Sequence, residues 1–360
     1  MPLPIALDYR PALLSRAGIG RATRELARAL THCPDLRVHL FGHSLARCKV
    51  AINVPETARL HRLPIAGRAL PMLRRIGIGA EHLAGNAKVF HWTDYVQPPV
   101  RNARTVLTVH DLAFVRDPSW HGDQAVELQE RTRTAIARAD ALVVPSRTTA
   151  KDVHAFAPHA PPMRVIPFGA DHVPDAIGPH PLNGRDYALC VGTIEPRKNH
   201  RALLAAWRAL PAPRPLLVVV GAIGWACDDI VADLGQAQQE GLVQWQPHCS
   251  DEQLWPLLQH AKLLAYPSLW EGFGFPPLEA MALGVPVVAH QTDPLRELGD
   301  DALTLADATN IDALTAAIER VLHDDAHRKA CIRAGQRRAQ SFVWRECAAA
   351  HADLYREVSS

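Results

Sequence analysis

Two carboxylates in the second half of the chain have a spacing that suits the binding of a polar ligand. Glu271 and Glu279 are eight residues apart in SLWEGFGFPPLEAMALGVPVV, residues 268–288, and a Gly-Phe-Gly turn follows the first of them. The two prolines that come next suit the first positions of a helix, because proline lacks the N–H group that is unpaired there. We therefore expect Glu279 in the first turn of a helix that Gly284 closes.

This passage offers a ligand both carboxylates and backbone donors. The N–H groups of the glycine turn would lie beside a helix N-terminus, whose dipole favours anions or a hydroxyl-rich ligand. Glu279 could accept two neighbouring hydroxyls, such as those of a ribose. The alternative is structural: Glu279 complements the helix dipole, worth ~0.3–1 kcal/mol, and Glu271 is a solvated loop residue. We favour ligand binding, because capping alone does not need two carboxylates, two glycines and a double proline.

Two adjacent cations follow an apolar run earlier in this half. In LCVGTIEPRKNH, residues 189–200, a strand is expected to lead through Gly192 to Arg197 and Lys198, and a helix to begin near Asn199. A guanidinium grips oxygen atoms in a fork and an ammonium neutralises a leaving group, so the pair predicts a diphosphate site. The GxxxxGK[ST] phosphate-binding loop is absent. An ordinary surface ion pair is the alternative.

Two weaker motifs lie in the first half. TVHDLAF at 108–114 places His110 and Asp111 at a strand end, although a lone histidine among 19 is more often structural. RAGIGRATREL at 16–26 opens a helical run at two glycines, Gly18 and Gly20. A dinucleotide fingerprint is disfavoured there, because threonine replaces the third glycine and about ten residues separate strand and glycines. A helix start close to a ligand and a simple loop-to-helix turn both remain open.

A basic stretch at 61–83 mixes arginines with leucine, isoleucine and methionine. Its charged residues are Arg62, Arg68, Arg74, Arg75 and Glu81. Near anionic lipid each arginine adds about 1 kcal/mol, enough for reversible docking but not for insertion. The alternative is an ordinary helix with a basic solvent-facing side.

Short apolar runs separated by amphipathic stretches must position these motifs. In the first half they are IALD at 5–8, VHLF at 38–41, VFHW at 89–92, TVLTVH at 105–110 and ALVVPS at 141–146. In the second half they are YALCVGT at 187–193, LLVVVGA at 216–222, LVQWQ at 242–246, KLLAYPS at 262–268 and VPVVAH at 285–290. Near-continuous apolar strands between helices predict parallel sheets covered on both faces, with ligands beyond the carboxyl ends of the strands.

The expected fold class is α/β, with two doubly wound, Rossmann-like domains that face each other across a cleft. A length of 360 residues favours two domains. The passage at 168–185 is rich in proline and glycine, which is typical of an interdomain linker. We expect a first domain, a linker, a second domain and a C-terminal helix that could pack back on the first domain, at 1–170, 171–185, 186–345 and 346–360.

Composition narrows the classes of function. Lys plus Arg total 39 against 37 for Asp plus Glu, which is too balanced for a protein that coats nucleic acid. Seven cysteines without repeated CxxC spacing argue against a zinc ribbon or a disulfide framework and suit the cytoplasm. No apolar run approaches 18 residues and no signal peptide is visible. Peripheral contact of 61–83 with the inner face of the cytoplasmic membrane is the remaining membrane role.

Together, the four motifs resemble those of the retaining glycosyltransferases of family 4, which have the GT-B architecture. The resemblance covers nearly the whole chain, and the carboxylate motif is its most specific part. VGTIEPRKN and SLWEGFGFPPLEA are most similar to bacterial mannosyltransferases that build O-antigen or exopolysaccharide. The resemblance implies transfer of a hexose from a nucleotide diphosphate sugar to a hydroxyl of a glycan or lipid-linked acceptor, without a metal or other cofactor.

The resemblance also implies roles for single residues. The expected catalytic residues are His110, Glu271, Arg197 and Lys198. The expected donor-binding residues are Gly18, Gly20, Gly192, Arg197, Lys198, Gly272, Phe273, Gly274, Phe275 and Glu279, and Asp111 is expected on the acceptor side. In the family the arginine and lysine are several residues apart, whereas here they are adjacent, so which cation takes which phosphate stays open.

The motifs indicate the identity of the donor and the acceptor less clearly than they indicate the reaction. The likeness favours GDP-mannose, with UDP-glucose and dTDP-rhamnose as alternatives. The glutamates are expected to grip the donor and no protein nucleophile is evident, which favours front-face attack by the acceptor. A non-catalytic sugar-nucleotide-binding subunit and an epimerase or phosphorylase on the same fold are the competing functions. The intact set of charged motifs argues against the former, and no pyridoxal lysine stands out for a phosphorylase.

Overall fold

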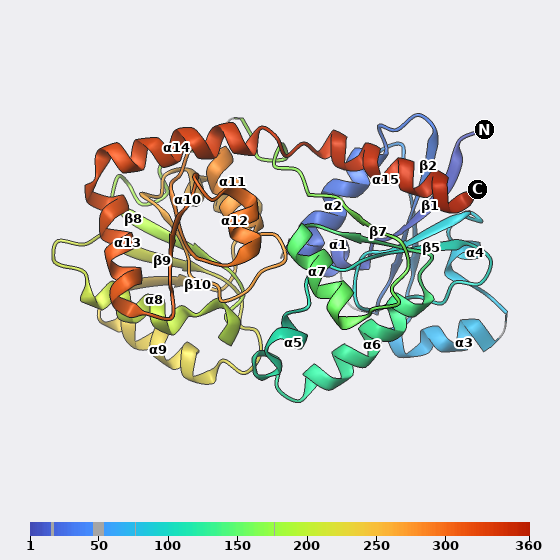
Figure 1. Cartoon of the computed structure of the whole chain (residues 1–360), viewed down its shortest axis with the longest axis horizontal. Coiled ribbons are helices and arrows are strands. Elements are labelled where there is room, and N and C mark those ends of the chain that lie inside the picture. The colour runs from blue at the N-terminus through green and yellow to red at the C-terminus, as the bar shows by residue number, and fades with distance from the viewer. Residues whose placement is uncertain (16–17, 46–53, 76, 176) are drawn as a thin grey trace. The chain divides into compact units, whose positions relative to one another are not determined.

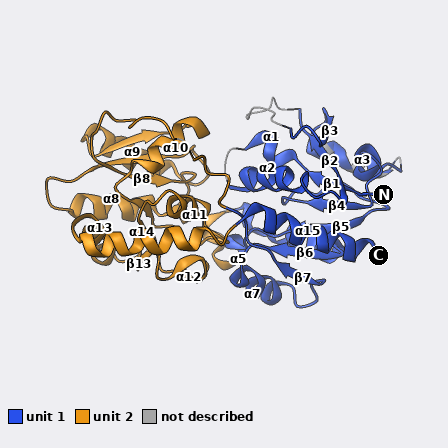
Figure 2. Ribbon diagram, turned by 90° about the horizontal axis from the view of Figure 1, so that it is seen from above, with its two compact units in different colours: residues 1–115, 123–169, 343–360 blue, residues 116–122, 170–342 orange. Residues whose placement is uncertain are grey.

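The computed structural model describes residues 1–15, 18–45, 54–75, 77–175 and 177–360 (Figure 1). Its contacts divide the chain into two compact units (Figure 2). Unit 1 comprises residues 1–115, 123–169 and 343–360, and unit 2 comprises residues 116–122 and 170–342. Each unit holds one parallel sheet with helices on both faces, so the predicted α/β class with two Rossmann-like domains is confirmed.

Unit 1 is built on a parallel sheet in the order β3-β2-β1-β4-β5-β6-β7. Its strands are β1 (Leu3–Asp8), β2 (Leu36–His43), β3 (Arg59–Leu63), β4 (Val89–Trp92), β5 (Arg104–Thr108), β6 (Ala141–Val144) and β7 (Met163–Val165). Its helices are α1 (Arg10–Leu14), α2 (Gly18–Leu30), α3 (Leu70–Arg75), α4 (Ala80–Leu83), α5 (Ala113–Arg116), α6 (Gln124–Arg138), α7 (Arg147–Phe156) and α15 (Trp344–Ser359). The strand order reverses between β1 and β4, the point at which ligands of such sheets bind.

Unit 2 has a parallel sheet in the order β10-β9-β8-β11-β12-β13. Its strands are β8 (Tyr187–Val191), β9 (Leu216–Val220), β10 (Val243–Gln246), β11 (Leu264–Tyr266), β12 (Val287–His290) and β13 (Thr304–Ala306). Its helices are α8 (His200–Ala209), α9 (Asp228–Gln239), α10 (Asp251–Gln259), α11 (Phe275–Ala282), α12 (Asp293–Gly299), α13 (Ile311–His323) and α14 (Asp325–Ala339). Here the order reverses between β8 and β11.

The interior strands follow from their apolar runs. Every residue of β4, β6 and β9 is buried, as expected for central strands that are covered on both faces. All ten expected strands are present. The strands that the sequence did not predict are β3, β7 and β13, and each lies at an edge of its sheet. An edge strand is only partly covered, so it lacks a continuous apolar run, as the burial pattern of β3 shows.

The basic stretch at 61–83 is not the single helix that was the alternative to membrane docking. It contains the end of β3, a 3-10 turn (Gly67–Ala69), α3 and α4. Glu81 is buried and accepts hydrogen bonds from the amides of Arg101 and Asn102, at 3.1 and 2.9 Å. The alternation of glycine and proline in this stretch breaks the helix into short pieces.

The last helix, α15, packs against α2, β4 and β5 within unit 1. Its Tyr355 hydroxyl lies 2.7 Å from Nδ1 of the buried His91. His351, one turn earlier, stacks on His91 with ring centroids 5.5 Å apart. Within the described residues, no helix is both long enough and apolar enough to cross a membrane.

Candidate active site

The two charged motifs of the second half follow the two strands at which the sheet of unit 2 reverses. Leu264 of β11 pairs with Leu189 of β8, so the loops after these strands emerge side by side. Arg197 and Lys198 are the last two residues of a 3-10 turn (Pro196–Lys198) after β8. Helix α8 begins at His200, with Asn199 as its N-cap, close to the predicted start. The amide of Leu269, in the loop after β11, donates to the Arg197 carbonyl at 2.8 Å. This hydrogen bond joins the two loops.

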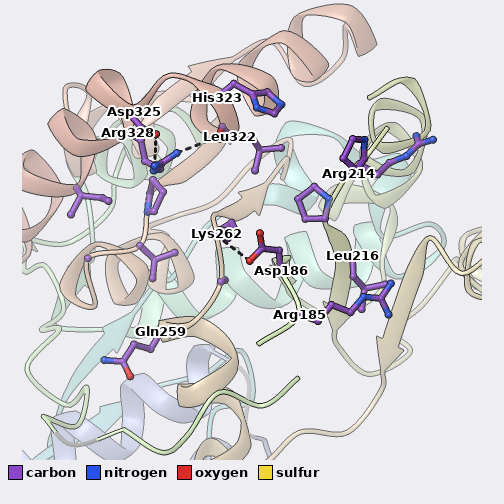
Figure 3. A pocket seen from close by; sticks show the side chains of 17 residues that line it. Arg185, Asp186, Arg214, Leu216, Gln259, Lys262, Leu322, His323, Asp325 and Arg328 are labelled. Atoms are coloured by element: carbon purple, nitrogen blue, oxygen red, sulfur yellow. Dashed lines mark hydrogen bonds and ion pairs between the residues drawn. The ribbon is translucent and has the colours of Figure 1, made fainter. Parts of the chain in front are cut away.

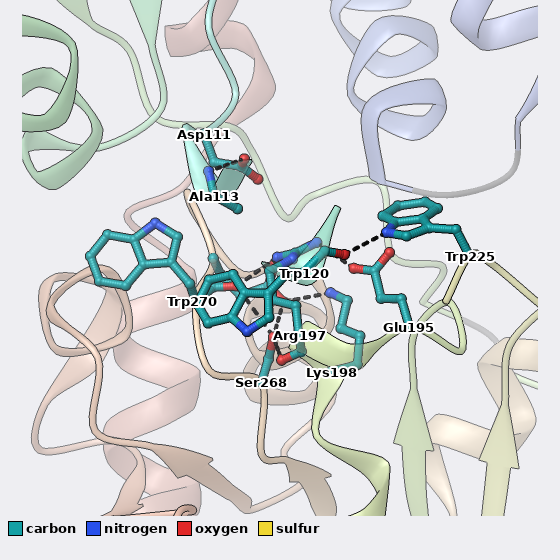
Figure 4. A network of polar contacts seen from close by, with 10 residues as sticks. Asp111, Ala113, Trp120, Glu195, Arg197, Lys198, Trp225, Ser268 and Trp270 are labelled. Atoms are coloured by element: carbon teal, nitrogen blue, oxygen red, sulfur yellow. Dashed lines mark hydrogen bonds and ion pairs between the residues drawn. The ribbon is translucent and has the colours of Figure 1, made fainter. Parts of the chain in front are cut away.

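Glu271 pairs with both cations, Lys198 and Arg197, which Figure 4 shows close together. Its Oε1 is 2.5 Å from Nζ of Lys198, and its Oε2 is 3.1 Å from Nη1 of Arg197. The Ser268 hydroxyl donates to Glu271 Oε1 at 2.5 Å. The Arg197 guanidinium also donates to the Trp270 carbonyl, at 2.5 Å. The structure therefore brings together three of the predicted catalytic residues.

The electrostatics of this group follow from its burial. The side chain of Glu271 is 10% exposed. Burial by itself would raise the pKa of Glu271, but Arg197, Lys198 and the hydrogen bonds from Lys198 and Ser268 outweigh it and hold the pKa at about 2. Glu271 is therefore a carboxylate at neutral pH and the counter-charge of both cations.

A third carboxylate, Glu195, was not predicted as a site residue. It is buried, and its Oε1 accepts from Nη2 of Arg197 at 2.7 Å. Burial raises the pKa of Glu195, against the opposing effect of Arg197 and Lys198. Arg197 thus lies between Glu195 and Glu271. The available signal was local, since Glu195 stands two residues before Arg197 in IEPRK.

Glu279 lies on α11 and not in its first turn, so this part of the prediction was wrong. The helix begins at Phe275, before the two prolines, which places Glu279 one turn further along. Oε1 of Glu279 lies 3.0 Å from Nε2 of His172, and both side chains are buried. No local pattern pointed to His172, because it lies in the expected linker, 107 residues away in the chain.

The turn before α11 requires glycine at position 274. Gly274 is the N-cap and has φ +106°, which strains any residue with a Cβ. The rings of Phe273 and Phe275 are buried, with centroids 5.5 Å apart. Gly272 is also buried, and Gly192 lies at the end of β8, beside the methylenes of Lys198. The predicted donor-binding residues of the second half thus line one edge of the unit 2 sheet.

The predicted residues of the first half lie in unit 1. His110 follows β5, and its Nε2 lies 2.9 Å from the Thr93 carbonyl. Burial lowers the pKa of His110, against the raising effect of that hydrogen bond and of Asp94 and Asp111. Asp111 accepts from the Ala113 amide at 3.0 Å and so supports the start of α5.

The glycines of unit 1 have a structural reason as well. Gly18 is the first residue of α2, as predicted. A Cβ on Gly20 would lie 2.1 Å from the Ser15 carbonyl oxygen, so only glycine allows this approach of α2 to the end of α1.

A further polar group at the carboxyl edge of unit 1 was not predicted. Asp8 ends β1 and is fully buried, and its Oδ1 accepts from the Arg10 amide at 3.1 Å. Arg10 pairs with Asp94 at 2.9 Å. Burial raises the pKa of Asp8 to about 8, although the Arg10 amide opposes it. Asp8 lies at the end of β1, Arg10 follows it, and Asp94 follows β4; the sheet order reverses between these two strands.

A cavity of about 690 Å³ opens at the opposite, amino-terminal edge of the unit 2 sheet (Figure 3). Several of its charged residues are paired with one another: Lys262 lies 3.1 Å from Asp186, and Arg328 lies 2.5 Å from Asp325. Ligands of doubly wound sheets bind at the carboxyl ends of the strands. The candidate active site is therefore the carboxyl edge of this sheet, where Arg197 and Glu271 lie.

Both halves of the chain match known glycosyltransferases. The family model described as glycosyl transferases group 1 matches residues 176–338, and a glycosyl transferase 4-like domain matches residues 17–169. An O-antigen chain mannosyltransferase B of Escherichia coli is 30% identical, over 98% of this chain and all of that protein. A mannosyltransferase of Mycolicibacterium hassiacum named for MMP α-(1→4) transfer is 30% identical over 66% of this chain and 58% of that protein.

Solved structures show the same fold. A sucrose-phosphate synthase of Thermosynechococcus elongatus superposes with a TM-score of 0.81 at 23% identity, over 99% of this chain and 98% of that one. Anabaena HepE, solved in complex with UDP-glucose, gives a TM-score of 0.76 at 17% identity, over 99% of this chain and all of that one. Because a full-length relative is 30% identical and models of the family match both halves, this chain belongs to the group 1 glycosyl transferases, the family 4 enzymes with the GT-B fold.

Proposed function

We propose that the protein transfers a hexose, with retention of anomeric configuration, from a nucleotide diphosphate sugar to a hydroxyl of a glycan or lipid-linked acceptor. GDP-mannose is the favoured donor, because the E. coli relative that matches over its whole length is a mannosyltransferase of the O-antigen chain. The observation that best supports this proposal is that Arg197, Lys198 and Glu271 lie together in the loops after β8 and β11.

In the proposed reaction the acceptor oxygen forms a bond to the anomeric carbon while the bond from that carbon to the β-phosphate oxygen breaks. The electron pair goes to the leaving diphosphate, which also takes the proton of the acceptor hydroxyl. Arg197 and Lys198 then stabilise the negative charge that grows on the diphosphate. Their hydrogen bonds to Glu271, Glu195 and the Trp270 carbonyl hold them in place before the donor arrives.

The carboxylates keep the other parts of the donor in position. Glu271 would accept hydrogen bonds from hydroxyls of the sugar. The backbone N–H groups of Gly272, Phe273 and Gly274 would donate hydrogen bonds to the sugar. Glu279, oriented by His172, would bind the ribose diol. In unit 1, His110 would approach the transferred sugar, Asp111 would lie on the acceptor side, and the start of α2 at Gly18 and Gly20 would border the ligand.

A thermal-shift screen with GDP-mannose, UDP-glucose and dTDP-rhamnose tests the donor. A specific ligand at about 100 times its dissociation constant adds ~2.7 kcal/mol to the stability. The product of transfer to a synthetic acceptor, followed by NMR of its anomeric proton, tests retention. Binding without transfer to any acceptor would favour the non-catalytic subunit, and inversion at the transferred sugar would remove the front-face mechanism.

We also propose that residues 61–83 contact anionic lipid. Met72 is 63% exposed and Arg75 is exposed on the same short helix, α3. Sedimentation with phosphatidylglycerol vesicles and with neutral phosphatidylcholine vesicles tests this proposal. Binding to the first that is lost in an Arg62→Ala, Arg75→Ala double variant supports it, and equal recovery from both vesicles contradicts it.

A further inference from the structure

Residues Arg116–Gly122 belong to unit 2, although the chain on either side of them belongs to unit 1. We call this segment the strap. It is ordered by its own hydrogen bonds: Asp117 accepts from the amide and the hydroxyl of Ser119, at 3.0 and 2.6 Å. The amide of Gly122 donates to the Pro118 carbonyl at 3.1 Å. The strap is therefore a turn held by its own hydrogen bonds.

The strap is anchored at two places in unit 2. The Arg116 guanidinium carbon lies 3.7 Å from the centre of the Trp270 ring, and Trp270 is only 3% exposed. The Trp225 indole N–H donates to the Trp120 carbonyl at 2.7 Å. The ring centroids of His121 and Trp225 are 5.5 Å apart.

These anchors lie on either side of the cation pair. Trp225 is in the loop after β9 and Trp270 in the loop after β11, and β8 lies between these strands. The loop after β8 carries Arg197 and Lys198. Figure 4 shows both cations between the two anchoring tryptophans.

One anchor is linked directly to the diphosphate site. The carbonyl of Trp270 accepts the hydrogen bond from Arg197 at 2.5 Å, and Glu271 is the next residue. Arg116 covers the Trp270 ring and so limits the positions that this residue can take. A cation over an indole face is the strongest of the cation–π pairings.

We propose that Arg116 is a positioning residue for the donor diphosphate. It acts through Trp270, which orients Arg197, and the hydrogen bond between Trp225 and Trp120 fixes the other end of the strap. This inference depends on the proposed function, because it assigns the diphosphate to Arg197.

The test compares Arg116→Ala and Arg116→Lys with Arg133→Ala in the full chain. Arg133 is the matched control, because it covers the ring of Phe156 at 4.4 Å within unit 1. We expect Arg116→Ala to lower kcat/KM for the donor and the calorimetric affinity for the nucleoside diphosphate by about tenfold each. Arg116→Lys, which keeps a cation over the ring, should recover most of both losses.

A second variant, Trp225→Phe, removes the indole donor and keeps a ring beside His121. It should also weaken nucleoside diphosphate binding, while melting temperatures of all variants without nucleotide stay near that of the wild type. If Arg116→Ala behaves as Arg133→Ala does in a chain that binds and transfers, the strap inference fails alone. If the wild type itself binds no nucleotide sugar, the proposed function fails with it.

Discussion

Nζ of Lys198 and Oε1 of Glu271 lie 2.5 Å apart, at the ends of two adjacent parallel strands. The cation assigned to the leaving group thus has a counter-charge within the chain, and Arg197 shares it. An incoming diphosphate must compete with Glu271 for both cations, while the sugar hydroxyls offer Glu271 new donors. Donor binding on this view is an exchange of partners among groups that are already in place.

Replacement of Lys198 by alanine should cost about 2 to 4 kcal/mol of transition-state stabilisation, because it removes a charge aimed at the developing diphosphate. Steady-state kinetics of transfer measure this as a loss in kcat. Lys262→Ala is the control, since Lys262 pairs with Asp186 at the opposite edge of the sheet. Transfer by Lys198→Ala within a factor of two of the wild type would refute the assignment.

Replacement of Glu271 by glutamine should lower the stability of the free protein. The loss of stability should be smaller when a nucleoside diphosphate is bound. The change leaves two partly buried cations without their shared counter-charge, at a cost of about 3 kcal/mol. A nucleoside diphosphate supplies negative charge at the same place. Thermal denaturation should therefore show a larger stabilisation by GDP or UDP in Glu271→Gln than in the wild type. An equal or smaller shift would contradict the exchange of partners.

Replacement of Glu279 by alanine should weaken the binding of a nucleoside diphosphate and leave the binding of pyrophosphate unchanged. The proposed hydrogen bonds go to the ribose, and such bonds to a charged group contribute about 1.5 to 3 kcal/mol. Calorimetry with both ligands separates the two effects. His172→Ala should weaken nucleoside binding less, because it removes only the group that orients the carboxylate. Equal weakening of pyrophosphate binding would argue against a ribose role.

Acid should destabilise unit 1 through two stacked buried histidines, His351 on α15 and His91 on β4. Burial lowers the pKa of His351 to about 4 and the pKa of His91 well below its usual value. The unfolded chain binds protons near pH 6.5, so stability is complete above that pH and falls as the pH decreases toward about 4.

For His351 alone the loss is about 2 kcal/mol at about pH 5. Chemical denaturation across this range measures it, and His351→Gln should flatten the profile by that amount. Substitution of the exposed His159 serves as the control. A His351→Gln profile parallel to that of the wild type would show that this group does not take up the proton.

Much of the fold could be predicted because interior parallel strands have a local signature. Runs such as LLVVV in β9 are apolar at every position, and the structure buries all of them. Three edge strands, β3, β7 and β13, were missed because one side of each lacks a neighbouring strand, so their sequences carry no continuous apolar run. For the stretch at 61–83, the alternative of a single helix was wrong because its leucines and arginines suggested a helix, whereas its glycines and prolines divide it.

The candidate site was predictable where one short passage carries the chemistry. Arg197, Lys198, Glu271 and Glu279 were identified from their own neighbours in sequence. His172 was not, since its role depends on a partner 107 residues away. The first-turn position of Glu279 was wrong because the helix starts at Phe275, ahead of the prolines.

The α/β class, the interior strands and the residue types at the strand ends could be predicted from the amino-acid sequence, because they depend on side chains close together in the chain. The contact between Glu271 and Lys198, 73 residues apart, follows from the folded chain only, because it depends on β8 and β11 being neighbours in the sheet. The same holds for Arg116 over the Trp270 ring, because these residues are far apart in the chain and only folding brings them together.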